Sequence, residues 1–186
     1  MKTTHQRFAM TLALIVVPVV ANAAGPQFTA VEGWLKPAPD MQSIGQAHGD
    51  VAVSSNGDVY VSVGGARGGV QVFDSAGKYL RNVPNAPTDF HGFIIRQEKA
   101  GEFIYGAQLS GQAILKMQLD GRIVLSIAGS TIPPELVAMR DGKPSLRLTN
   151  VDVAPDGRIF AVDGYSSDII HVFDANGKYL ESFGGK

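Results

Sequence analysis

The stretch VFDSAGKYL, residues 72–80, returns almost unchanged as VFDANGKYL at residues 172–180. The similarity is longer than these segments, because 49–83 aligns with 149–183 without a gap. A more divergent copy lies between them, at 91–127. The chain therefore repeats one unit three times, as expected when successive units solve the same packing problem by stacking on one another.

The third copy shows the internal pattern of the unit most clearly. Its apolar or alternating stretches lie at 150–153, 158–162, 168–173 and 178–182. Pro155-Asp156-Gly157 and Asn176-Gly177 interrupt them, and such pairs are typical of hairpin turns because glycine adopts positive φ without strain. Four short strands in about 40 to 45 residues are typical of one blade of a β-propeller.

The sequence thus predicts an all-β protein, specifically a partial β-propeller with about three four-stranded blades. The expected blades are approximately 46–85, 88–128 and 146–186, with an insertion at 130–147. A single sheet cannot bury both faces alone, so the blades are expected to pack on one another. The aromatic residues of the repeated motif are expected to lie between neighbouring sheets rather than to stack on a ligand: Phe73, Tyr79, Phe173 and Tyr179.

Two segments fall outside the repeat. Residues 27–39 are expected to form one extra strand that completes a last blade. In the insertion, Pro133-Pro134 is expected to open a short helix over 135–139, which Asp141-Gly142 ends. This excursion is either a lid over the central channel or an ordinary connection.

The sequence stops at Lys186 just where a further blade is expected, whereas propellers close with about four to eight blades. Either the chain is a truncated product, which we favour, or two copies pair to complete a ring of six.

The amino-terminal segment predicts export. Lys2 and Arg7 precede an apolar run over 8–20, and Ala21-Asn22-Ala23 supplies small residues for cleavage after Ala23. This is the pattern of a secretory signal at 1–23. The alternative, a membrane anchor, needs about 20 apolar residues. We expect a secreted or periplasmic protein.

Composition excludes several classes of function. The chain has 17 acidic and 16 basic residues, a net charge of −1 and no cysteine. The acidic balance argues against a nucleic-acid surface, and the lack of cysteine excludes disulfides, a thiolate nucleophile and cysteine-type zinc sites. No later segment is long and apolar enough to predict a membrane span.

The blade texture resembles NHL-repeat six-bladed propellers, and the order of motifs narrows the resemblance. FTAVEGW at 28–34, DFHGF at 89–93 and the run 148–185, which contains Asp163-Gly164-Tyr165, together resemble the peptidyl-α-hydroxyglycine α-amidating lyase group. The match covers the amino-terminal half of such a propeller. The resemblance implies a zinc-dependent lyase that cleaves an N–C bond at a hydroxyglycine.

The resemblance also implies roles for individual residues. His91, in FHGF, stands where the first zinc histidine belongs, and Tyr165 occupies the place of the base. Arg67, in GGARGG, lies near the position of a substrate-binding arginine, out of register with it. The other two zinc histidines would fall in blades outside this sequence.

The residues themselves allow the same site and simpler alternatives. His48 and His91 are each followed by glycine at a blade opening, so both could face one axis and share a metal, or merely begin strands. The Tyr165 phenol would act as a base only with a pKa lowered from about 10; otherwise it caps a turn. Arg67 could bind a carboxylate bidentately or lie in a flexible loop.

Two functional classes remain. The first is an exported binding module that takes a peptide, protein or glycan at the channel mouth, with self-association through open blade edges as a further option. The second is part of the amidating-type lyase. His171, between Ile170 and Val172 in an alternating strand, is expected to face away from both.

Overall fold

The computed structural model describes residues 25, 27–46, 49–65 and 68–185. The chain divides into two units, Met1–Glu32 and Gly33–Lys186. The described residues of the first unit, 25 and 27–32, lie in no helix or strand. The predicted signal segment 1–23, His48 and Arg67 fall outside the described residues.

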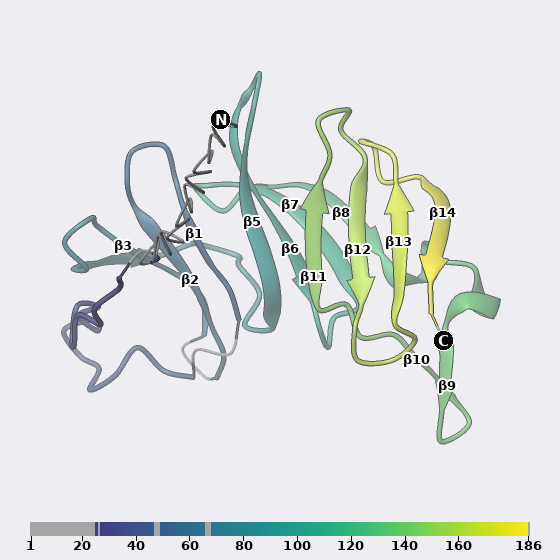
Figure 1. Cartoon of the computed structure of the whole chain (residues 1–186), viewed down its shortest axis with the longest axis horizontal. Helices are drawn as coiled ribbons and strands as arrows, with labels where there is room; N and C mark the ends of the chain where they lie inside the picture. Colours follow the sequence, from purple (N-terminus) through teal and green to yellow (C-terminus); the bar gives the residue numbers. More distant parts are fainter. Residues whose placement is uncertain (1–24, 26, 47–48, 66–67, 186) are drawn as a thin grey trace, which may run out of the picture. The chain divides into compact units, whose positions relative to one another are not determined.

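The second unit is all-β and contains three four-stranded antiparallel sheets, each with its strands in chain order. The first sheet comprises β1 (Val51–Val53), β2 (Val59–Val63), β3 (Gly69–Phe73) and β4 (Tyr79–Asn82). The second comprises β5 (Phe90–Glu98), β6 (Gly101–Gln108), β7 (Ala113–Gln118) and β8 (Ile123–Ala128). The third comprises β11 (Asn150–Val153), β12 (Ile159–Asp163), β13 (Ile169–Phe173) and β14 (Tyr179–Gly184), drawn side by side in green to yellow (Figure 1).

The all-β prediction is confirmed, and the four strands read from the third repeat form where they were expected. Each four-stranded sheet lies within one of the three ranges expected as blades. The alternating pattern predicted these strands correctly because burial of one face of a strand fixes its register.

The repeated VFDxxGKYL motif is a strand, a turn and the start of a second strand. In both copies the aspartate Oδ1 accepts hydrogen bonds from the backbone N–H groups two and four residues later, at 2.9 Å. Gly77 and Gly177 hold φ of 80° and 84°, which a side chain would resist. Asp74 and Asp174 therefore stabilise the two turns, and this role accounts for their presence in the motif without a ligand.

The aromatic residues of the motif pack against each other in the same way twice. Phe73 and Tyr79 lie 5.9 Å apart at 78°, and Phe173 and Tyr179 repeat both values. Both phenylalanines are fully buried. Phe173 and Tyr179 lie between the second and third sheets, as expected from the sequence. Phe73 and Tyr79 also pack in a hydrophobic cluster, but Leu35 and Ile44, which lie in no strand, cover them in place of a neighbouring sheet.

The second sheet contributes to two hydrophobic clusters, one on each face. One cluster joins it to the first sheet through buried residues that include Tyr60, Val70, Phe93, Ile104 and Met117. The other joins it to the third sheet through residues that include Tyr105, Ile114, Val151, Ile159 and Phe173. The middle sheet therefore packs against both of the others, through a separate cluster on each face.

The insertion differs from its prediction. The expected helix over 135–139 is wrong: a short 3₁₀ turn covers Pro134–Leu136, and a hairpin of β9 (Ala138–Arg140) and β10 (Lys143–Ser145) follows. Asp141 and Gly142 both have positive φ, 50° and 72°, so Asp-Gly is a two-residue hairpin turn rather than a helix end. A further 3₁₀ turn covers Gly129–Thr131.

The extra strand expected at 27–39 does not form. Within that segment the described residues make one isolated bridge, between Lys36 and Lys78. A strand exists only through pairing with a neighbour along its length, and a single bridge at Lys36 does not supply that pairing. Among the described residues, no helix is long and apolar enough to cross a membrane.

His171 faces away from Ile170 and Val172, as predicted, and it points into the core. Its side chain is fully buried, and its Nδ1 lies 2.8 Å from Ser182 Oγ. Nε2 has no hydrogen-bond partner among the described residues. Burial lowers the pKa of this imidazole, and the nearby Asp163 carboxylate opposes that effect.

Candidate functional site

His91 occupies a β-bulge at the start of β5. The pairing of β5 with β6 runs from Phe90 opposite Gln108 to Gly92 opposite Ala107, so the ladder skips His91. A bulge leaves one residue out of the alternation and turns its side chain in a new direction. The histidine consequently points away from the sheet that carries it, toward the start of the third sheet.

Gly92 permits that approach because its position has no room for a side chain. A Cβ there would lie 2.6 Å from both Thr149 O and Asn150 Oδ1. The close passage of β5 beside the segment that leads into β11 places His91 Nδ1 2.9 Å from Thr149 O. Two structural requirements thus explain the His-Gly pair. The bulge redirects the His91 ring, and the absence of a side chain at Gly92 lets the 149–150 backbone pass close by.

Tyr165 lies in the loop after β12, and Asp163 fixes the conformation of this loop. The buried Asp163 carboxylate accepts hydrogen bonds from Arg147 N at 2.8 Å, Ser167 N at 3.2 Å and Ser167 Oγ at 2.7 Å. Gly164 packs against Thr149, whose Oγ1 would be 2.6 Å from a Cβ. In the Asp-Gly-Tyr motif, the first two residues therefore position the third.

His91 and Tyr165 meet across 74 residues of sequence. Tyr165 Oη lies 2.9 Å from His91 Nε2, and the rings are 5.0 Å apart at 88°. The Thr149 carbonyl can only accept a hydrogen bond, so Nδ1 carries the proton in this contact. Nε2 of the neutral ring then accepts the hydrogen bond that Tyr165 donates. The Tyr165 hydroxyl thus directs its proton at the imidazole of His91. The Tyr165 residue as a whole is 54% exposed.

A cavity of about 190 Å³ adjoins His91. Its lining residues come from the first two sheets and the segments beside them: Gln46, Gly64, Thr88, Asp89, Phe90, His91 and Leu109. The Asp89 carboxylate in this lining accepts hydrogen bonds from Ser110 N and Gly111 N, both at 2.9 Å. The cavity is small and places one face of the histidine next to open space.

The sequence named His91 and Tyr165 separately, and the structure brings them together. His48 and Arg67 lie outside the described residues, so their predicted roles stay predictions. Sequence reasoning missed Thr149, which contacts the histidine through its carbonyl and sits against Gly164. The available signal was the glycine next to each of these two residues, since Gly92 and Gly164 both approach the 149–150 segment.

The described residues contain no group of three or more His, Asp or Glu side chains placed to hold a metal ion. His91 could supply one ligand through Nε2, with Nδ1 oriented by the Thr149 carbonyl, as second-shell partners commonly orient a metal-bound imidazole. Nε2 has a single lone pair, so a metal there would displace the Tyr165 hydroxyl. A complete zinc site is not formed by the described residues.

A second polar cluster lies on the second sheet. Its lysine and glutamate form an ion pair, and both side chains are held in their charged forms. Lys116 Nζ lies 2.8 Å from Glu98 Oε2, and Tyr105 Oη donates to Glu98 Oε1 at 2.5 Å. Burial disfavours the charge on Lys116, but the hydrogen bonds with Glu98 and Tyr105 outweigh it and raise the lysine pKa. Burial likewise acts against the Glu98 charge, yet the hydrogen bond from Lys116 helps to lower the pKa of that carboxyl.

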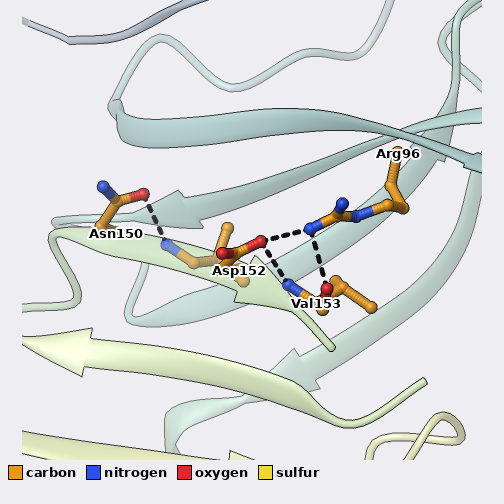
Figure 2. A network of polar contacts seen from close by, with 5 residues as sticks. Arg96, Asn150, Asp152 and Val153 are labelled. Atoms are coloured by element: carbon orange, nitrogen blue, oxygen red, sulfur yellow. Dashed lines mark hydrogen bonds and ion pairs between the residues drawn. The ribbon is translucent and has the colours of Figure 1, made fainter. Parts of the chain in front are cut away.

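A groove of about 580 Å³ lies on the third sheet, beside β5. Its floor contains Phe160, Val162 and Ile170. At one margin Arg96 reaches from β5 to β11, with its guanidinium 2.6 Å from Asp152 Oδ1 and 2.8 Å from Val153 O (Figure 2). The groove is therefore mainly apolar, with one ion pair at its margin.

Comparison with solved structures bears on the fold alone. A protein of unknown function from Bacteroides caccae aligns with a TM-score of 0.50 at 14% identity, over 72% of this chain and 47% of its own length. A protein from Lactobacillus plantarum aligns with a TM-score of 0.52 at 16% identity, over 73% of this chain and 41% of its own length. This chain thus spans less than half the length of either. No family model and no curated protein matches the sequence.

Proposed function

We propose that the three sheets are successive blades of a partial β-propeller of the NHL type. Two features support this: each sheet has four antiparallel strands in chain order, and the middle sheet packs against both of the others. Propeller blades bury their faces in the same manner. The amino-terminal sequence pattern supports export, to a secreted or periplasmic location.

The function proposed for this protein is the binding of an extended peptide at the His91–Tyr165 pair. The observation that carries it is the 2.9 Å hydrogen bond from Tyr165 Oη to His91 Nε2. With its proton directed to the imidazole, the phenol oxygen of this half-exposed residue keeps lone pairs for a ligand N–H. Peptide backbones supply such donors, and the loop after β12, whose conformation Asp163 fixes, presents the acceptor in a defined position.

Calorimetric titration with short peptides that end in glycine tests this proposal. Tyr165→Phe removes the acceptor and is expected to weaken binding about 2- to 10-fold, the value of one hydrogen bond. The matched control is Tyr79→Phe, which alters a phenol in the first sheet that bonds to Asn82. Equal affinity for the unmodified protein and Tyr165→Phe would contradict the proposal, as would binding of glycans alone.

A second candidate function is a zinc-dependent lyase of the amidating type, of which this chain would be a part. The contact between His91 and Tyr165 favours it, because the resemblance assigns these two residues to the metal and to the base. With a metal on His91 Nε2, the Tyr165 hydroxyl would no longer donate to that nitrogen, and a Tyr165 phenolate beside the metal ligand would accept the proton of a ligand hydroxyl. Zinc would supply Lewis acidity if ligands beyond the described residues complete its site.

Metal analysis of the purified protein decides whether zinc is bound. The lyase proposal expects near-stoichiometric zinc that is lost in His91→Ala and retained in Tyr165→Phe, because only the histidine is a ligand. It also expects glyoxylate and a peptide amide from a peptidyl-α-hydroxyglycine. A well-folded sample without zinc would overturn the lyase proposal and leave the peptide-binding proposal intact.

A further inference from the structure

The turn between the last two strands of each sheet carries a different residue in each copy of the repeat. The residue before the turn glycine is Ala76 in the first sheet, Asp120 in the second and Asn176 in the third. The following glycines have φ of 80°, 94° and 84°, and each donates its N–H to the carbonyl three residues earlier. The geometry of this turn therefore does not depend on asparagine.

Asparagine followed by glycine is a chemically reactive pair, and the sequence contains two of them, Asn56-Gly57 and Asn176-Gly177. The glycine backbone nitrogen, once deprotonated, attacks the asparagine Cγ. A C–N bond forms, the Cγ–Nδ2 bond breaks, and Nδ2 leaves as ammonia with the proton that the glycine nitrogen lost. Water then opens the resulting succinimide at either carbonyl, which gives aspartate or isoaspartate. Glycine favours the attack because it has no Cβ to hinder the approach.

The two asparagine–glycine pairs occupy turns of the same backbone geometry. Gly57 and Gly177 have φ of 89° and 84°, and each donates its N–H to the carbonyl three residues earlier, at 2.9 and 3.0 Å. Asn56 and Asn176 are both exposed. Backbone conformation and exposure to water therefore do not distinguish the two pairs.

The side chains of the two asparagines differ in how they are held. Asn56 Oδ1 accepts hydrogen bonds from Ser54 Oγ at 2.6 Å and Asp58 N at 3.1 Å, and its Nδ2 donates to Asp58 Oδ2 at 2.9 Å. The Asn176 carboxamide has no hydrogen-bond partner among the described residues, although its backbone N–H donates to Asp174 Oδ1. Turning Cγ toward the glycine nitrogen thus disturbs three hydrogen bonds of Asn56 and none of Asn176.

We infer that Asn176 is a site of spontaneous deamidation in the folded protein, and that its hydrogen bonds protect Asn56 from the same reaction. The loss of two hydrogen bonds of ordinary strength slows a reaction by roughly 10-fold or more. Asn176 therefore reacts faster than Asn56 by at least this factor. The reaction needs only water and a base, and no partner protein takes part in it.

The two products affect the turn differently. Aspartate is the residue of the second copy, where Asp120 Oδ1 accepts the Arg122 N–H at 2.9 Å, so an aspartate at position 176 fits the turn. Isoaspartate adds one carbon to the main chain. The turn lies tightly on the second sheet, because a Cβ at Gly177 would be 2.8 Å from Ile127 Cγ1. The isoaspartyl product therefore moves the turn away from Ile127 and weakens the contact between the second and third sheets.

Peptide mapping by mass spectrometry during incubation at mildly alkaline pH tests the inference. The peptide that contains Asn176 is expected to deamidate roughly 10-fold or more faster than the peptide that contains Asn56. In concentrated urea, where Asn56 loses its hydrogen bonds, the two rates should approach each other. Equal rates in the folded protein would overturn the inference, as would a difference that persists unchanged in urea.

Two substitutions taken from other copies of the repeat isolate the cause. Asn176→Ala, which matches Ala76, should abolish the fast reaction and leave Asn56 unchanged. Ser54→Ala, which matches Ala154, removes the hydroxyl that donates to Asn56 Oδ1 and should speed the reaction of Asn56 about 2- to 10-fold. Circular dichroism confirms that both variants are folded. An Asn56 rate that Ser54→Ala leaves unchanged would overturn the proposed protection.

Urea unfolding of the separated products tests the effect on the turn. Ion-exchange chromatography separates the deamidated forms from the unmodified protein, because each carries an additional negative charge. The isoaspartyl form should unfold at a lower urea concentration than the unmodified protein. Asn176→Asp is the matched control, since it adds the same charge without lengthening the main chain, and it should unfold with the unmodified protein. Equal midpoints for the isoaspartyl form and Asn176→Asp would contradict the displacement of the turn.

Discussion

At the scale of single residues, two equivalent positions carry buried polar side chains in different ways. Gln71 and His171 occupy the same place in the first and third sheets, and both are almost fully buried. Gln71 Nε2 donates to Ile44 O at 2.9 Å, whereas His171 Nδ1 meets Ser182 Oγ. Each residue also has one buried atom without a partner among the described residues. Such atoms carry a desolvation cost that reduces stability.

The buried imidazole predicts a pH dependence of stability. Burial lowers the His171 pKa below its ordinary value of 6.5, with Asp163 acting in the opposite direction. Below about pH 6.5 the unfolded chain binds a proton that the folded chain resists. The free energy of unfolding should therefore fall as the pH decreases from about 6.5 through the folded-state pKa, and it should not depend on this residue above pH 6.5.

Urea unfolding between pH 8 and pH 5, with His171→Gln as the comparison, checks this expectation. Glutamine is accepted at the equivalent position 71, so the variant is expected to fold and to lose the part of the slope that His171 causes. His91→Gln is the control histidine, since its ring is only partly buried. An equally steep loss of stability in His171→Gln would show that other groups cause it.

The individual contacts of the candidate site could not be predicted from the sequence, for physical reasons. The motifs singled out His91 and Tyr165, but their meeting depends on a bulge that redirects the histidine and on Gly92 admitting the 149–150 segment. Both are properties of how two sheets approach each other. No spacing along the chain records them.

At the scale of elements, the repeated turn is the best-determined part of the fold. Asp74 bonds two backbone N–H groups, Gly77 supplies the positive φ, and Asp174 and Gly177 repeat the arrangement. These requirements are local, so the motif could be interpreted from the sequence. The hairpin at 138–145 was missed although Asp141-Gly142 is also a turn signal, because Pro133-Pro134 favoured a helix start and the strands around the turn are only three residues long.

Removing the turn aspartate should measure its contribution. Asp74→Ala leaves the N–H groups of Ala76 and Lys78 without their side-chain acceptor, and we expect the free energy of unfolding to fall by about 0.5–1.5 kcal/mol. Ser75→Ala, at the exposed neighbouring position, is the matched control and should change it by less than about 0.5 kcal/mol. Equal effects of the two substitutions, measured by urea unfolding, would refute the capping role of Asp74.

At the scale of the whole of Gly33–Lys186, the middle sheet holds the core together. Ile104 lies in the cluster shared with the first sheet, and Ile114 lies in the cluster shared with the third. Because both clusters include residues of one sheet, loss of packing on either side should weaken the same cooperative unit. The sequence predicted stacked repeats, but it could not say which segment outside the repeat covers the first sheet; Leu35 and Ile44 do so without forming a strand.

This cooperativity can be tested with two probes. Ile104→Ala and Ile114→Ala should each lower the free energy of unfolding by about 2–5 kcal/mol. Fluorescence of Trp34, the only tryptophan, reports on the segment that contacts the turn before β4, and far-ultraviolet circular dichroism reports on all sheets. The two transitions should coincide in both variants. A Trp34 transition that Ile114→Ala leaves unmoved would show that the first sheet unfolds independently.

The chain-order arrangement of the strands has a consequence for biogenesis. Every strand of the first sheet precedes every strand of the second, so the first sheet can pair as soon as it leaves a ribosome or a translocation channel. Tyr60 and Val70 have no cover until the middle sheet follows. At ribosomal speed, about 40 further residues take roughly 2–8 s. For that interval the nascent chain exposes the apolar face of the first sheet that carries Tyr60 and Val70, and chaperones bind exposed apolar surfaces of this kind.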